Sequence, residues 1–180
     1  MKIQLPVQGF SQYDVTVDEK IQSSACGPVT AYVLLTYLLP NGHPHIPNNL
    51  YRQLKGTRIG LFTFRFIKYL RRLLGANWTI QKCTVEDALQ ELQHGRPVAL
   101  KFDKYLTFKW RKSFSFSYHW VPMIGYEQIN DEIYLIVHDN GGRGRDSTIR
   151  KIKYADNRPI LTFVKVVPPD SASPVVHELK

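Results

Sequence analysis

The chain has 180 residues, of which 43% are hydrophobic, and it carries a formal net charge of +9. This length predicts one domain over residues 1–180 with a sizeable core, and it excludes a second full domain. The sequence has no apolar run near the roughly 20 residues that cross a bilayer, and residues 1–8 lack the apolar centre of a signal peptide. We therefore expect a cytoplasmic protein with no transmembrane segment.

The first long predicted helix begins at a cysteine. Residues 22–30 read QSSACGPVT, and the helix is expected to run from about Cys26 to Leu39, where a Pro-Asn-Gly sequence ends it. The first turn of a helix offers unpaired N–H groups and the positive end of the macrodipole, which stabilise a thiolate. A buried structural thiol is the alternative. Gly27 and Pro28 favour a reactive cysteine, because proline suits a first helical turn and glycine admits close backbone approach.

The middle of the chain is strongly basic. A short helix is predicted near Asn48–Leu54, and a second helix over Thr63–Leu74 separates its basic and apolar residues onto different faces. Seven basic residues and no acidic residue lie in segment 51–75: Arg52, Lys55, Arg58, Arg65, Lys68, Arg71 and Arg72. This basic surface is either merely solvated or receives an acidic partner such as an acidic peptide, a nucleic-acid backbone or an anionic membrane.

A strand, a helix and a further strand are predicted next. The strand covers Trp78–Lys82, and Thr84 is the expected N-cap of a helix that ends before Gly95, with Asp87 three residues after the cap. The second strand covers Pro97–Phe102. After it, segment 102–120 interleaves aromatic and basic residues, which either line a substrate cleft or pack into the core. Nucleic-acid binding is a minor alternative, because no recognised motif accompanies the segment.

An antiparallel hairpin is predicted from Tyr118–Tyr126 and Glu132–Asp139. If its turn is centred on Ile129, residues whose numbers sum to 258 face each other, and His119 lies opposite Asp139. A turn centred one residue later pairs His119 with residue 141 instead. In the first register the carboxylate is close enough to hold the imidazole.

Other candidate side chains have simpler interpretations. His138 is expected to point to the opposite face of its strand from Asp139. His43 and His45 flank a proline without cysteine or carboxylate neighbours, which indicates a solvated loop and no metal site. Cys83 is interpreted as a structural thiol. Neither a cofactor nor a metal is expected.

The end of the chain is predicted to complete the sheet. Segments 149–153 and 160–167 are expected to be its closing strands, and residues 140–145 form a glycine-containing loop beside Asp139. Residues 168–180 are polar and contain proline, so they are expected to form a loose tail.

Three short motifs in order resemble a known family. They are Cys26-Gly27-Pro28 opening a helix, a histidine starting a strand with Gly125 six residues later, and Asp139-Asn140 ending the next strand. Together they resemble the papain-like cysteine peptidases, and among these the bacterial double-glycine (bacteriocin leader) peptidases and their stand-alone soluble relatives. The resemblance implies that Cys26 attacks a carbonyl, His119 shuttles the proton and Asp139 orients the histidine.

The resemblance also implies a glutamine that donates to the oxyanion hole, five or six residues before the cysteine. The only glutamine close by is Gln22, four residues before Cys26. Either Gln22 donates its side-chain amide, or the hole depends on the Cys26 backbone N–H and another group.

These patterns predict an α+β architecture with the papain-like cysteine peptidase fold. A helical N-terminal half carrying Cys26 packs on an antiparallel sheet carrying His119 and Asp139, and the cleft lies between them. The predicted function is a cysteine peptidase that hydrolyses peptide or amide bonds through a thioester on Cys26. Alternatives are a catalytically idle papain-like domain that binds a peptide or anionic partner, an acyl or peptidyl transferase of the same superfamily, and a basic nucleic-acid or membrane-surface module.

Overall fold

The computed structural model describes residues 1–106 and 114–169. Most of the predicted tail, residues 170–180, and the centre of the aromatic and basic segment, residues 107–113, lie outside the described residues. Among the helices of the described ranges, none is long and apolar enough to cross a membrane.

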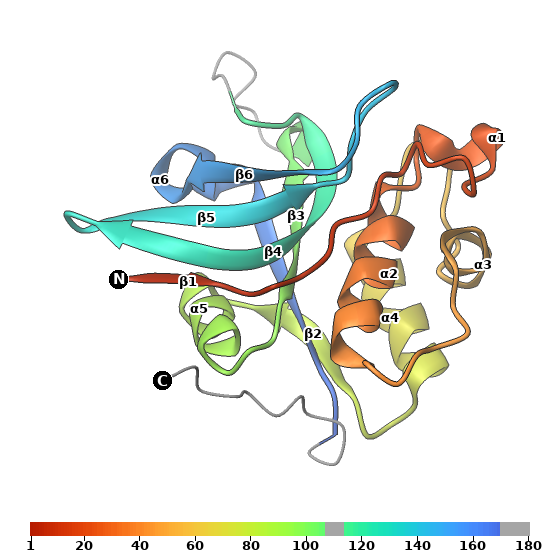
Figure 1. Cartoon of the computed structure of the whole chain (residues 1–180), viewed down its shortest axis with the longest axis horizontal. Helices are drawn as coiled ribbons and strands as arrows, with labels where there is room; N and C mark the ends of the chain where they lie inside the picture. Colours follow the sequence, from red (N-terminus) through yellow and green to blue (C-terminus); the bar gives the residue numbers. More distant parts are fainter. Residues whose placement is uncertain (107–113, 170–180) are drawn as a thin grey trace.

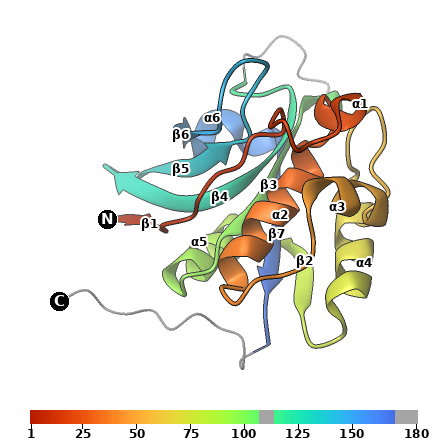
Figure 2. The ribbon, with the colours of Figure 1, turned by 45° about the vertical axis from the view of Figure 1, so that its right-hand side comes forward.

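The helices of the N-terminal half gather on one side of the molecule (Figure 1). They are α1 (Glu19–Gln22), α2 (Cys26–Leu38), α3 (Pro47–Gln53) and α4 (Thr63–Leu74). The predicted helices at Cys26, Asn48 and Thr63 are confirmed, whereas α1 was not predicted because it is only one turn long. Helix α2 contacts the sheet through β4 and contacts α3 on its other side (Figure 2).

The strands form one antiparallel sheet in the order β2-β7-β3-β4-β5-β6, with β1 added beside β4. The strands are β1 (Lys2–Gln4), β2 (Thr79–Cys83), β3 (Val98–Asp103), β4 (Tyr118–Ile129), β5 (Glu132–Asp139), β6 (Thr148–Lys153) and β7 (Leu161–Val167). The remaining elements are helix α5 (Val85–Gln93), helix α6 (Tyr154–Asn157) and the 3-10 turns η1 (Lys104–Leu106) and η2 (Arg158–Ile160). The predicted strands are confirmed, and the closing strands occupy different places, β6 at an edge and β7 between β2 and β3.

Both faces of the sheet are covered, because alternate residues of its strands enter two different cores. Trp120 and Val164 pack with α2, α3 and α4 on one face, whereas Val121 and Phe163 pack with α5 on the other. Helix α5 begins with the predicted cap: the Thr84 hydroxyl accepts from the Asp87 N–H at 3.1 Å and the Asp87 carboxylate accepts from the Thr84 N–H at 3.1 Å.

The hairpin forms as predicted, but the first of its two predicted registers is wrong, whereas the alternative, with a sum of 260, matches the pair beyond the bulge. Its turn residues are Asn130 and Asp131, which both have positive φ, and pairs next to the turn, such as Ile129 with Glu132, have residue numbers that sum to 261. A β-bulge follows, beyond which Met123 pairs with Val137 and the sum is 260. The predicted sum of 258 failed because the turn lies later in the sequence and because a bulge leaves no pattern in hydrophobicity alone.

The bulge decides which side chains share a face. A one-residue slip moves every following side chain to the other face of a strand. Continued past Met123, the register of 260 puts His119 and Asp139 on one face as diagonal neighbours, whereas the register of 261 would put them on opposite faces. Gly125, on the turn side of the bulge, must lack a side chain because a Cβ there would run into the Ile3 carbonyl of β1.

Candidate active site

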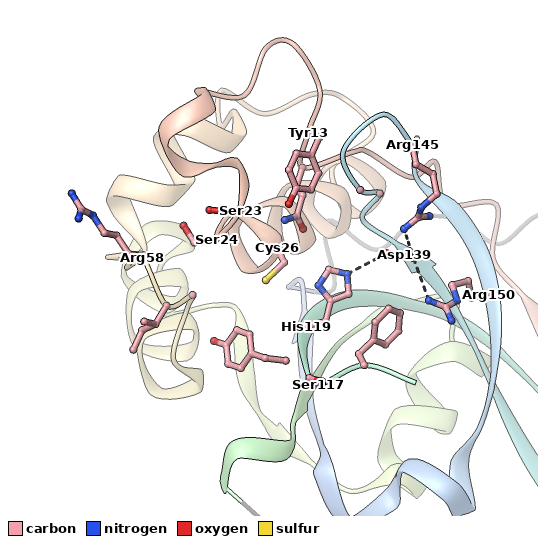
Figure 3. Close-up of a pocket in the computed structure, with 17 residues that line it drawn as sticks. Tyr13, Ser23, Ser24, Cys26, Arg58, Ser117, His119, Asp139, Arg145 and Arg150 are labelled. Atoms are coloured by element: carbon pink, nitrogen blue, oxygen red, sulfur yellow. Dashed lines mark hydrogen bonds and ion pairs between the residues drawn. The ribbon is translucent and has the colours of Figure 1, made fainter. Parts of the chain in front are cut away.

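A cavity of ≈ 430 Å³ lies where the helical half meets the sheet. Its described walls come from the loop before α1, the start of α2, the turn at residues 57–60, the start of β4 and the segment that follows β5. Cys26, His119 and Asp139 all line this cavity, so the structure brings together three residues that are 93 and 20 positions apart in sequence, 119 − 26 and 139 − 119 (Figure 3).

Cys26 is the first residue of α2. Its backbone N–H is therefore one of the groups that an α-helix leaves without an intrahelical acceptor. The Cys26 side chain lies beside the ring of His119 (Figure 3), and the two groups interact. Gly27 allows this placement, since a Cβ at residue 27 would lie 2.8 Å from the Leu61 side chain.

His119 stands between the thiol and the carboxylate. Its Nε2 lies 3.2 Å from Oδ1 of Asp139, which leaves Nδ1 for Cys26. The two side chains are only 12% and 3% exposed, so water screens their interaction weakly. The ring also packs on Phe116, with centroids 4.9 Å apart.

These contacts set the protonation of the histidine. Burial alone would lower the pKa of His119, but its hydrogen bond with Asp139 and its interaction with the Cys26 thiol outweigh burial and raise the pKa to about 9. Burial also opposes ionisation of Asp139, yet its hydrogen bonds with His119 and Arg145 hold the pKa of that carboxyl below its usual value. At neutral pH the site therefore holds an imidazolium against a carboxylate.

Two arginines that the sequence analysis did not connect to Asp139 contact it. Nη2 of Arg145 lies 2.8 Å and Nη1 of Arg150 lies 3.4 Å from Oδ2 of Asp139, the oxygen that does not contact His119 (Figure 3). Asp139 pairs with Thr148 across β5 and β6, which puts Arg150 two residues further along the same face. A prediction of the β5–β6 register would have found Arg150.

Asn140 connects the two halves of the site and was also missed as a contributor. Its fully buried Nδ2 lies 3.0 Å from the Cys26 carbonyl, 2.8 Å from the Trp120 carbonyl and 3.0 Å from Oγ1 of Thr30. One carboxamide thus joins the first residue of α2 to the residue after His119.

The expected oxyanion-hole residue, Gln22, and a second glutamine, Gln12, which was not predicted, have different surroundings. Gln22 does not appear among the residues that line the cavity, and its amide nitrogen lies 3.4 Å from the Asp14 carbonyl and 3.2 Å from the Val17 carbonyl. Gln12 does line the cavity. Its Nε2 donates to the Gln22 carbonyl at 2.7 Å, and its buried Oε1 has no hydrogen-bond partner among the described residues.

The other candidates lie elsewhere. His138 contacts the Ser147 hydroxyl at 2.8 Å and does not line the cavity. His43 contacts the Thr36 hydroxyl at 3.0 Å and stacks on His45. Burial raises the pKa of Cys83 to about 11, with the Asp87 charge contributing, so that thiol stays protonated at neutral pH. No group of metal-binding side chains occurs in residues 1–106 and 114–169.

Comparison with known proteins gives a family and a fold. The model of the Peptidase_C39 like family matches residues 4–159. The peptidase domain of Streptococcus ComA, a bi-functional ABC transporter involved in a quorum sensing pathway, is 13% identical with a TM-score of 0.54, covering 92% of this chain and 98% of that one. A Bacillus anthracis protein described as a C39-like peptidase is 13% identical with a TM-score of 0.60, covering 91% and 97%. No curated protein matches the chain.

Proposed function

Since the chain belongs to the Peptidase_C39-like family and has the papain-like fold, we propose that it is a cysteine peptidase that cleaves a peptide or amide bond through a thioester on Cys26. The observation that carries the proposal is the alignment of the Cys26 thiol, the His119 ring and the Asp139 carboxylate along one wall of the cavity. The family makes a peptide the expected substrate.

In the proposed reaction the proton of the Cys26 thiol already resides on His119 when the peptide arrives, so the nucleophile is a thiolate beside an imidazolium. The thiolate attacks the scissile carbonyl carbon and forms a tetrahedral oxyanion, and the imidazolium then gives its proton to the departing amine. The products of this half are a free amine and a thioester on Cys26. Water, deprotonated by the neutral imidazole, attacks the thioester and releases the carboxylic acid and the thiol. Asp139 orients the ring and stabilises its charged form.

We assign the oxyanion hole to the Cys26 backbone N–H and the Gln12 side chain. Gln12 lines the cavity, and its amide nitrogen has a second N–H besides the one that the Gln22 carbonyl accepts. The Gln12 backbone N–H donates to the Asn140 carbonyl at 2.8 Å, which fixes Gln12 beside the catalytic carboxylate. Loss of an oxyanion donor costs on the order of 100-fold or more in rate.

The proposal is tested by peptide-library cleavage with two cysteine variants. Wild-type protein and Cys83→Ala are expected to cleave the same peptides, whereas Cys26→Ala is expected to cleave none. Alkylation at neutral pH is expected to modify Cys26 well before Cys83, and His119→Ala to slow it. Equal, slow alkylation of both thiols together with no cleavage by the wild type would overturn the proposal.

A further inference from the structure

Three arginines surround the candidate catalytic groups. Arg58 lies on one side of the cavity, and Arg145 and Arg150 lie on the other, with Cys26 and His119 between them (Figure 3). Among the described residues that line the cavity, Asp139 is the only carboxylate. The transfer of a proton from Cys26 to His119 changes no net charge, so the cavity keeps an excess of positive charge throughout the reaction.

The arginines retain free capacity to bind an anion. The side chains of Arg145 and Arg150 are 47% and 43% exposed, and both reach the same oxygen of Asp139. Each guanidinium has five N–H donors, so a contact with one shared oxygen leaves most of them available. Arg145 uses some of the others on the Asp146 carbonyl and the Thr148 hydroxyl. Arg58 is exposed at a tight turn and has no ion-pair partner among the described residues.

The arginines beside Asp139 are also held in position before any ligand arrives. Asp139 fixes both guanidinium groups, and the Arg150 guanidinium lies 4.6 Å from the centre of the Phe116 ring. An ordered guanidinium loses less side-chain entropy on binding than a free one, and its planar fork matches a carboxylate. Positive groups that line a concave site also concentrate their field there, which the open face of α4 cannot do.

From this arrangement we propose that the cavity selects a peptide that carries a carboxylate close to the bond placed over Cys26. The carboxylate is either an acidic side chain or a free C-terminus, since both present the same two oxygens to the arginines. The inference rests on the proposed function for the statement that the occupant is a peptide. Arg58, Arg145 and Arg150 would then determine specificity, and Arg145 and Arg150 would also position Asp139.

The test measures binding, so that it does not depend on catalysis. The dissociation constants of fluorescent peptides of one length are measured with the Cys26→Ala protein. One series of peptides carries Glu or Gln at each position in turn, and a second series has a free or an amidated C-terminus. We expect at least one carboxylate to improve the dissociation constant by about 10-fold over its amide, an effect of a charge-assisted arginine contact. Added salt should reduce this preference. The Glu–Gln series and the C-terminal series distinguish the two sources of the carboxylate.

Charge-matched variants identify the groups responsible. Arg58→Gln, made in the Cys26→Ala background, removes an exposed arginine that contacts none of the proposed catalytic residues. We expect this variant and Arg150→Gln each to reduce the carboxylate preference by at least about 3-fold. Arg72→Gln removes the same charge from the exposed face of α4, outside the cavity, and should leave the preference unchanged.

Three outcomes would overturn the inference: equal binding of the acid and amide peptides, an equal effect of Arg72→Gln and Arg58→Gln, or tighter binding of a single-stranded oligonucleotide than of any peptide. Wild-type cleavage separates the two proposals. Cleavage without any carboxylate preference would overturn this inference and leave the peptidase proposal intact. A carboxylate preference in binding without cleavage of any peptide would overturn the peptidase proposal alone.

Discussion

Asp139 divides its two oxygens between different partners. Oδ1 contacts His119, and Oδ2 contacts Arg145 and Arg150. The hydrogen bonds with His119 and Arg145 hold the pKa of the carboxyl below its usual value, and the contacts of both arginines with Oδ2 restrict its rotation, so the oxygen that contacts the imidazole stays in place. Because the carboxylate favours the charged imidazole, the pH range of the proposed activity depends on this side chain as well as on Cys26.

The pH dependence of kcat/KM tests that role. In the proposed reaction the imidazolium must give its proton to the leaving amine, so the rate should fall as pH rises through about 9, where His119 loses that proton. Asp139→Asn removes the negative charge and lowers the pKa of His119. The alkaline limb of the Asp139→Asn profile should therefore shift to lower pH, and its kcat/KM should be on the order of 10- to 100-fold lower than that of the wild type.

Asp146→Asn is the matched control for this prediction. Asp146 is near in sequence but accepts from Arg145 through its backbone carbonyl, so its variant should keep the wild-type profile. An alkaline limb at the same pH in Asp139→Asn and wild type would contradict the role given to Asp139.

The sequence predicted three of the site residues because each has a strong local context. Cys26 precedes Gly27 and Pro28 at a helix start, and His119 and Asp139 lie in strands with clear patterns. Gln12 could not be found in this way. It lies 14 residues before Cys26, 26 − 12, and only the turns and the short helix α1 between them bring it back to the cavity.

At the scale of elements, Asn140 joins helix α2, which carries Cys26, to strand β4, which carries His119. Its amide reaches the Cys26 carbonyl at the start of α2 and the Trp120 carbonyl of β4. The distance between thiol and imidazole depends on how these two elements are held, and a displacement near 1 Å can cost about 100-fold in rate.

Asn140→Ala is therefore expected to reduce kcat by about 10- to 100-fold while KM changes little, because the ground-state binding walls remain. Asn48→Ala is the control. The Asn48 carboxamide also links distant segments, through the Thr16 carbonyl and the Asp18 N–H, but away from the cavity. Steady-state kinetics of both variants give the comparison, and an unchanged kcat in Asn140→Ala would show that α2 and β4 keep their positions without this contact.

Element types were predictable, and their relative registers were not. Helix α5 follows from its Thr84 and Asp87 cap, and the start of α2 follows from Pro28 in its first turn, because both signals are local. The bulge between Met123 and Gly125 depends on how β1, β4 and β5 pack together, which no short segment of sequence specifies.

For the molecule as a whole, the Trp120 side chain connects the helical half to the sheet. Its ring stacks on Phe66 of α4 with centroids 4.7 Å apart, and its Nε1 donates to the Leu61 carbonyl at 2.8 Å. Tyr118 donates to the same carbonyl at 3.0 Å. These contacts hold the end of the turn that carries Arg58 against the strand that carries His119.

Trp120→Phe should lower the free energy of unfolding by about 1–3 kcal/mol, through the lost hydrogen bond and the smaller ring in a close-packed core. Urea denaturation measures the loss. Tyr118→Phe removes only the second hydrogen bond to Leu61 and should cost about 1 kcal/mol or less. Equal free energies of unfolding for Trp120→Phe and wild type would show that packing of the helical half on the sheet does not require these Trp120 contacts.

Strand β4 holds one residue more than its partner at the bulge, since Gly125 pairs with Ile136 and Met123 pairs with Val137. A related chain without that extra residue, and with the same turn, would keep both pairs. Its histidine and its acid would stay on one face of the sheet, but they would lie 19 residues apart, 20 − 1, in place of 20. The spacing between histidine and acid in relatives should therefore change by one residue wherever this irregularity is gained or lost.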